Sequence, residues 1–149
     1  MYKFIMVTLL FCSIATPALA GVVLDHGFVR AMPPGQKITA AYMSLTNTDA
    51  QDAVVSAVSS DMAARVEIHE SYIRDGMMAM RPLTVITVPA QGRLEFAPGG
   101  AHLMLFGIER QLKEGDQVNI SLQYNNGVSQ QFLLPVKRQQ MTSNHHMHH

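Results

Sequence analysis

Short runs of alternating or uniformly apolar residues, separated by turn residues, predict a chain built from β-strands. Residues 39–47 show the pattern most clearly, because Ala41, Met43 and Leu45 alternate with polar or aromatic residues and so share one strand face. Similar runs predict strands at 22–30, 53–58, 64–70, 83–88, 93–96, 102–108, 117–124 and 130–136. Turn residues recur about every eight to twelve positions, which is typical of a single all-β sandwich or barrel.

Turn residues and polar stretches mark the boundaries of these strands. The pair Asp75-Gly76 predicts a two-residue type I′ hairpin turn, since that turn requires positive φ at both central residues. One helical turn is expected within 59–65, and no stretch has the period of an amphipathic helix. Residues 139–149 are polar and have no apolar period, which predicts a flexible tail behind a domain of residues 21–138.

The first twenty residues predict a secretory signal peptide. An apolar stretch at 4–14 follows a positive charge, and a small-x-small cleavage signal occupies 18–20. The stretch is too short for a transmembrane helix, so we expect a periplasmic protein cut after Ala20, with no membrane anchor. Cys12 leaves a lipid anchor as the alternative, although it follows a large phenylalanine where a lipidated cysteine usually follows a small residue.

The composition narrows the chemistry of the exported part. It contains no cysteine and therefore no disulfide, and its length is sufficient for one hydrophobic core. The formal net charge is zero with neutral histidines, and there is no basic patch, which makes nucleic acid and anionic membranes unsuitable partners. Eleven of the 149 residues are methionine, of which Met32, Met43 and Met62 are expected to fill the core or the loops.

Two histidine–methionine pairs are spaced so that each shares one face of the predicted strands. His102 and Met104 are two residues apart in a strand, so both side chains lie on the same side of it. Counting outward from the predicted hairpin turn places His69 opposite Pro82, and His69 and Met80 then form a diagonal pair roughly 7–8 Å apart at the backbone. A slip of one residue would place this pair on opposite faces.

Imidazole combined with thioether and without thiolate indicates copper. Thioether sulfur binds Cu(I) well and hard cations poorly, while imidazole accepts several transition metals. A single histidine or methionine in a strand is usually a surface or core residue, so the prediction depends on the combined spacing His69-x10-Met80-x21-His102-x-Met104. A blue-copper electron-transfer site needs a cysteine thiolate, so the cysteine-free exported chain favours Cu(I) carriage instead.

The four-ligand spacing resembles that of the periplasmic copper chaperones of the PCu(A)C family, without any gap. The resemblance covers about residues 30–136. It includes the segments around the ligands at 64–70, 80–82, 98–105 and 112–116. Many members carry an additional methionine one or two residues after the first histidine, where this chain has Glu70 and Ser71. Only the four matched residues are therefore assigned as ligands.

The resemblance implies a fold and a function. The fold is a cupredoxin-like Greek-key β-sandwich that holds one Cu(I) in an exposed His/Met site. The function is delivery of copper to the dinuclear centre of cytochrome c oxidase subunit II, with Sco-type thiol proteins as further candidate partners. We expect a monomer. We also expect no enzymatic activity, because the sequence contains neither a nucleophile–base pattern nor a phosphate-binding loop.

A second cluster of histidine and methionine ends the chain. Its members are His145, His146, Met147, His148 and His149. Closely spaced imidazoles favour Cu(II) or another divalent ion, so we expect the tail to capture oxidised copper and Met141 and Met147 to retain the reduced ion. A purification tag and a solvated tail without a role are the alternatives, and the methionine interruption disfavours the first.

Two other functions remain open at this stage. In the first, the protein sequesters copper and has no dedicated acceptor. In the second, it is a β-sandwich interaction module whose histidines and methionines bind no metal. His26 is expected to be an exposed strand residue, with a weak secondary metal site near the new N-terminus as the alternative.

Overall fold

The computed structural model describes residues 21–138, and every regular element in that range is a β-strand. The strands are β1 (Val22–Arg30), β2 (Ile38–Asn47), β3 (Ala53–Ser60), β4 (Arg65–Arg74), β5 (Met77–Leu83), β6 (Ile86–Val88), β7 (Arg93–Phe96), β8 (Ala101–Phe106), β9 (Gln117–Tyr124) and β10 (Ser129–Lys137). The described part contains no helix long and apolar enough to cross a membrane. The predicted signal peptide and the terminal His/Met cluster lie outside the described residues.

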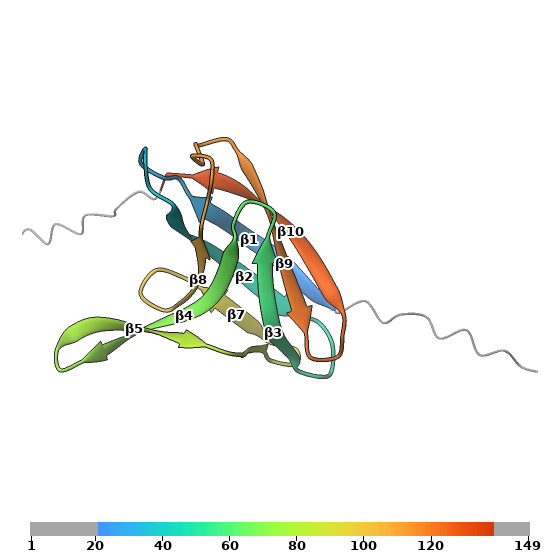
Figure 1. Cartoon of the computed structure of the whole chain (residues 1–149). Helices are drawn as coiled ribbons and strands as arrows, with labels where there is room; N and C mark the ends of the chain where they lie inside the picture. The colour runs from blue at the N-terminus through green and yellow to red at the C-terminus, as the bar shows by residue number, and fades with distance from the viewer. Residues whose placement is uncertain (1–20, 139–149) are drawn as a thin grey trace, which may run out of the picture.

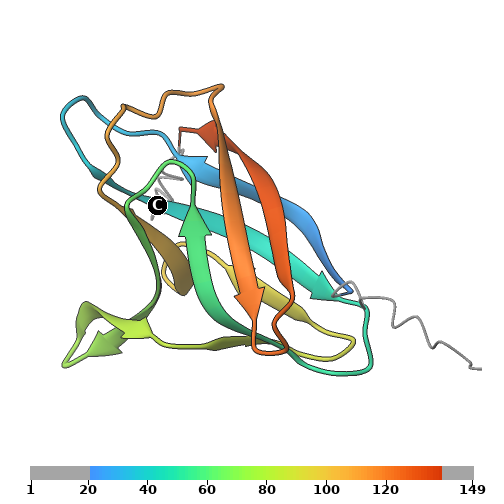
Figure 2. The same cartoon turned by 45° about the vertical axis from the view of Figure 1, so that its right-hand side comes forward.

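The strands form two layers that are joined along one edge. One layer has the order β5-β4-β8-β2-β1, with β7 also paired to β2, and the other has the order β10-β9-β3-β6. A short parallel pairing of β1 with β10, through Val29↔Val136 and Arg30↔Lys137, connects the layers. Figure 2 shows β9 and β10 crossing in front of β1 and β2. The predicted all-β sandwich is confirmed.

Alternating side chains from both layers form the core. Leu103 and Leu105 of β8 belong to the same hydrophobic cluster as Ile120 and Leu122 of β9, and all four are completely buried. The side chains of a strand alternate between its two faces. His102 and Met104, which alternate with Leu103 and Leu105 on β8, therefore face away from this core. The functional candidates of β8 therefore lie on the outer face of the first layer.

The methionines expected to pack do so. Met32 and Met43 are buried in the core, and Met62 packs against its edge. The remaining methionines of the described part, which lie on β5 and β8, are half-buried or exposed. Packing therefore accounts for only some of the unusual methionine content.

Three local predictions were wrong. The strand expected at 83–88 is two strands, because the chain leaves β5 after Leu83, exposes Val85, and resumes as β6 in the other layer. The strand expected at 102–108 ends at Phe106, where Gly107 adopts a positive φ of 71°, outside the β region. The helical turn expected within 59–65 is a turn at 61–62 that follows the end of β3.

Candidate metal centre

Strand β8 carries the second histidine–methionine pair on its outer face. The chain enters β8 through a tight turn in which Gly100 N donates to Ala97 O at 3.0 Å and Ala97 N donates to Ala101 O at 2.8 Å. Gly99 adopts a φ of 84° in this turn, a conformation that glycine alone adopts readily. His102 and Met104 follow with their side chains on the same side, as the sequence predicts.

The β4–β5 hairpin carries the first pair, in the register predicted from its turn. Asp75 and Gly76 have φ values of 51° and 77°, as a type I′ turn requires. The observed pairing includes Ser71↔Met80 and His69↔Pro82. His69 and Met80 are therefore a diagonal pair on one face, and the predicted register is confirmed.

The structure adds a contact that the sequence did not predict: the two histidines lie directly opposite each other. β4 pairs with β8 through His69↔His102, and the ring centroids are 6.1 Å apart. A metal–nitrogen bond is about 2 Å long, so two imidazoles that share one ion hold their centroids up to roughly 6 Å apart. The spacing of the two rings fits a single bridging ion.

The two methionines flank this histidine pair on opposite sides. Met104 lies two residues beyond His102 on β8, pairs with Glu67 of β4 and is half-buried. Met80 lies across β4 on the hairpin and exposes 58% of its surface. All four predicted ligands thus share one face of three adjacent strands, with the thioethers at the two ends.

Hydrogen bonds fix which ring nitrogen of His102 is free. Its Nδ1 lies 3.0 Å from the Gly100 carbonyl oxygen. A carbonyl oxygen only accepts, so Nδ1 carries the proton and Nε2 of the neutral ring keeps the lone pair that a metal needs. His102 is only 5% exposed, so this orientation is held by packing as well as by the hydrogen bond.

Glu67 is a member of the site that the sequence analysis missed. His69 Nε2 donates to Glu67 Oε2 at 2.9 Å, and Arg65 Nε lies 2.6 Å from the other carboxylate oxygen. The pKa of the Glu67 carboxyl lies below its ordinary value, first because of the hydrogen bond from His69 and then because of Arg65. With Nε2 protonated, the lone pair of the neutral His69 ring lies on Nδ1.

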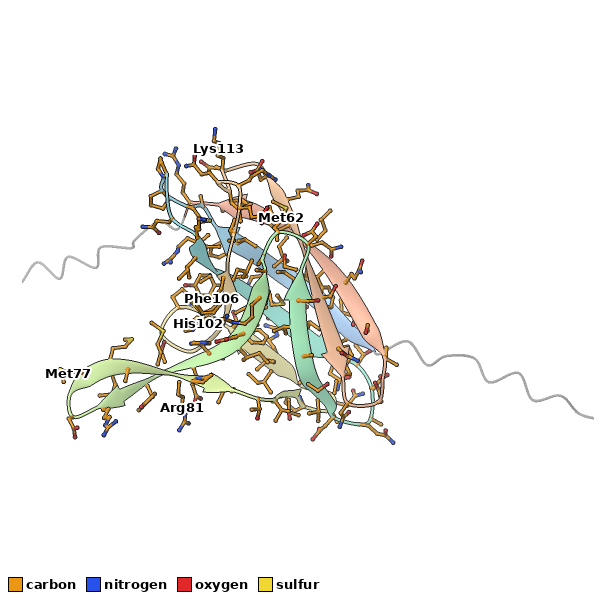
Figure 3. The ribbon with its side chains drawn as sticks, viewed as in Figure 1. Met62, Met77, Arg81, His102, Phe106 and Lys113 are labelled. Atoms are coloured by element: carbon orange, nitrogen blue, oxygen red, sulfur yellow. The ribbon has the colours of Figure 1, made fainter. Side chains whose placement is uncertain are left out.

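Aromatic rings enclose the histidines on the sheet surface. Tyr42 lies 6.3 Å from His102 between ring centroids, and Phe106 lies 6.1 Å from His69. The Arg65 guanidinium covers Phe106 at 4.5 Å. Figure 3 shows His102 and Phe106 near one another at the base of the hairpin. This apolar surround limits water around the histidines and strengthens electrostatic interactions within the site.

The described residues contain no metal-binding group made only of histidine, cysteine and carboxylate side chains. Among residues 21–138, no three side chains of histidine, cysteine, aspartate or glutamate converge into a metal-binding group. The further donors on this face are the thioethers of Met80 and Met104, and thioethers select soft ions. His26 lies apart on β1, is 67% exposed in its side chain and faces Glu95 at 3.6 Å, so it is the exposed strand residue that the sequence predicts.

Sequence comparisons find a family and a relative that match most of this chain. The sequence model of the LpqE-like family, described as lipoproteins, matches residues 22–136. The protein Lxx21020 of Leifsonia xyli subsp. xyli, which also has the word lipoprotein in its name, is 30% identical over 135 residues, covering 85% of this chain and 80% of that protein.

Solved structures of PCuAC domains and of DR1885 share the architecture. The copper-bound PCuAC domain from PmoF2 superimposes with a TM-score of 0.68 at 20% identity, covering 82% of this chain and 97% of that one. The solution structure of apo-DR1885 from Deinococcus radiodurans gives 0.63 at 29% identity, covering 93% and 97%. Its Cu(I) form gives 0.58 at 32% identity, covering 85% and 82%. These matches confirm the predicted cupredoxin-like fold.

Proposed function

The chain belongs to the LpqE-like family and has the fold of the PCuAC domains, and from this premise we propose that it is an exported copper carrier. Copper would be its cargo, held as Cu(I) by His69, Met80, His102 and Met104. The copper-bound PmoF2 domain and the Cu(I) form of DR1885 support this choice of metal.

The observation that carries the proposal is the opposition of His69 and His102 between two thioethers. The rings are 6.1 Å apart, and the methionines extend the same face on both sides. Four neutral ligands stabilise the reduced ion, and thioethers bind without losing a proton. Because the described residues include no cysteine, the site lacks the thiolate that electron-transfer copper centres use.

The placement of the ligands suits a carrier that releases its cargo. Met80 is more than half exposed on a hairpin, so an incoming thiolate can reach the ion without unfolding the sandwich. A thiolate-rich acceptor would then outcompete neutral ligands for Cu(I). We propose the dinuclear copper site of cytochrome c oxidase subunit II as this acceptor, with Sco-type thiol proteins as additional partners.

Export agrees with the lipoprotein names of the family and of its relative. The sequence offers two routes: cleavage after Ala20, which releases a periplasmic protein, or lipidation of Cys12, which anchors it. Mass spectrometry of the purified native protein separates them. A chain that begins at Gly21 supports the first route, and a diacylated chain that begins at Cys12 supports the second.

The terminal cluster adds a second proposal, that the tail binds Cu(II). Its histidines and methionine are His145, His146, Met147, His148 and His149. Removal of residues 139–149 should lower the Cu(II) capacity and leave one Cu(I) site. An unchanged Cu(II) stoichiometry would refute a metal role of the tail.

An anaerobic Cu(I) competition titration tests the carrier function directly. Wild type should bind one Cu(I) with high affinity, and Met80→Ala should bind it more weakly. Equal affinities would refute the assigned site, and no tight binding by wild type would favour an incidental interaction module. Mixing the loaded protein with a subunit II domain then separates delivery from sequestration, because only a carrier with this acceptor transfers its copper.

A further inference from the structure

The β4–β5 hairpin extends beyond the sheet that supports the site. The pairing of β4 with β8 stops at Glu70↔Ala101, whereas the pairing of β4 with β5 continues to Arg74↔Met77. In Figures 1 and 2 the hairpin projects away from both layers. Its outer half is therefore a two-stranded arm that begins beside the histidines and ends in open solvent.

One face of this arm continues the face of the metal centre. The pairs Ser71↔Met80 and Ile73↔Met78 lie on the side that carries His69, because residues at i and i+2 share a face. Met78 and Met80 expose 64% and 58% of their surfaces. They are neighbours about 6.6 Å apart along the strand, within reach of one ion held between their long side chains.

Met77 provides a contrast at the tip of the same arm. It directly precedes Met78 in the chain and is 71% exposed, but strand alternation places its side chain on the opposite face. Exposure alone therefore does not distinguish Met78. Its distinguishing property is that it adds a thioether to the same face, one step outward from Met80.

We propose that Met78 is an outer thioether ligand through which Cu(I) enters and leaves the histidine pair. On exit, a bond between Cu(I) and Met78 Sδ forms while the bond to the first imidazole nitrogen breaks. The bonds to the second imidazole and to Met104 break as the ion moves outward to Met78 and Met80, and each released donor regains its lone pair. The metal remains Cu(I), and no electron or proton is transferred. The ion thus moves from the enclosed histidines to a pair of thioethers on the exposed arm, where an acceptor can take it. This inference rests on the proposed carriage of Cu(I).

The test measures the rate of copper exchange with the Cu(I) chelator bicinchoninate under anaerobic conditions, by stopped flow. Met78→Leu keeps the apolar volume and removes the sulfur. We expect about tenfold slower loading and unloading, which corresponds to about 1.4 kcal/mol of barrier. The equilibrium affinity should stay unchanged, because Met78 binds the ion only in passage. Met77→Leu is the matched control and should exchange at the wild-type rate.

The outcomes separate this inference from the proposed function. If wild type binds Cu(I) and Met78→Leu exchanges as fast as wild type, the outer ligand is refuted while carriage stands. The same result would follow if Met78 served only as an apolar contact, since leucine preserves that contact. If Met77→Leu and Met78→Leu slow exchange equally, the face-specific role is also refuted. If wild type binds no Cu(I), both proposals fail.

Discussion

Replacing Met80 by leucine should weaken Cu(I) binding without weakening the fold. Met80 exposes 58% of its surface and lies on the arm, so the free energy of unfolding should change by no more than about 0.5 kcal/mol. Leucine cannot ligate copper. Loss of a partner that merely orients a metal ligand costs about 10–100-fold in affinity, so loss of a ligand should cost at least about tenfold. A tenfold loss corresponds to about 1.4 kcal/mol.

The two quantities can be measured on the same samples. An anaerobic competition titration gives the Cu(I) affinity, and urea unfolding of the copper-free protein gives the stability. Thermal unfolding with copper present supplies a cross-check, because a ligand at 100 times its Kd stabilises the native state by about 2.7 kcal/mol. At the same free copper concentration, a tenfold weaker variant should gain only about 1.4 kcal/mol.

Met104→Leu is the matched comparison at the other end of the site. Met104 is half-buried, and a volume-conserving replacement there should cost less than about 1.5 kcal/mol of stability. Both leucine variants should lose Cu(I) affinity and keep their Cu(II) affinity, since thioethers contribute little to Cu(II) binding. Wild-type Cu(I) affinity in Met80→Leu, with the fold intact, would refute the assignment of Met80 as a ligand.

Three further predictions concern the support of the site and of the fold. Glu67→Ala removes the acceptor that orients His69, so Cu(I) affinity should fall by about 10–100-fold. Glu67→Gln keeps an acceptor oxygen and should retain most of the affinity. Equal Cu(I) titration curves for wild type and Glu67→Ala would contradict an orienting role. Gly107→Ala places a Cβ 2.7 Å from an alanine methyl carbon at a φ of 71°, so urea unfolding should show a loss of more than about 1 kcal/mol. The pKa of the Asp116 carboxyl is lowered, first by a hydrogen bond from the Lys113 backbone. The ionised carboxylate therefore stabilises the fold above about pH 3.8, the ordinary pKa of the group, and this stabilisation is lost as the pH falls through the lowered pKa of the folded state. Asp116→Asn should therefore be less stable at neutral pH and lose less stability during acid titration, and an unchanged acid limb would contradict this.

Local chemistry made the arm predictable from the sequence. The Asp75-Gly76 turn permits few backbone conformations, so it fixed the register and with it the diagonal of His69 and Met80. The pairing of His69 with His102 joins strands that are far apart in the chain, and no local signal specifies it. The family resemblance brought the four ligands together, but it did not predict that two of them lie directly opposite each other.

Two omissions have different physical causes. Glu67 lies two residues before His69, so the same parity argument that paired His102 with Met104 would have found it. The break of the predicted strand after Leu83 was not accessible in this way. Residues 83–88 are uniformly β-prone, and the change of layer follows from the tertiary pairing of β6 with β3.

Because the arm projects from the sandwich, substitutions in the arm and substitutions in the sandwich have separate effects. Residues 72–79 pair only with each other, while the core is formed by the layers behind them. Substitutions, insertions or the exchange of this segment for that of a relative would therefore alter which proteins can approach the ion without altering the sandwich. A family with this architecture can acquire new recipients while its scaffold stays constant, and the arm is the natural unit to graft when the recipient is to be changed by design.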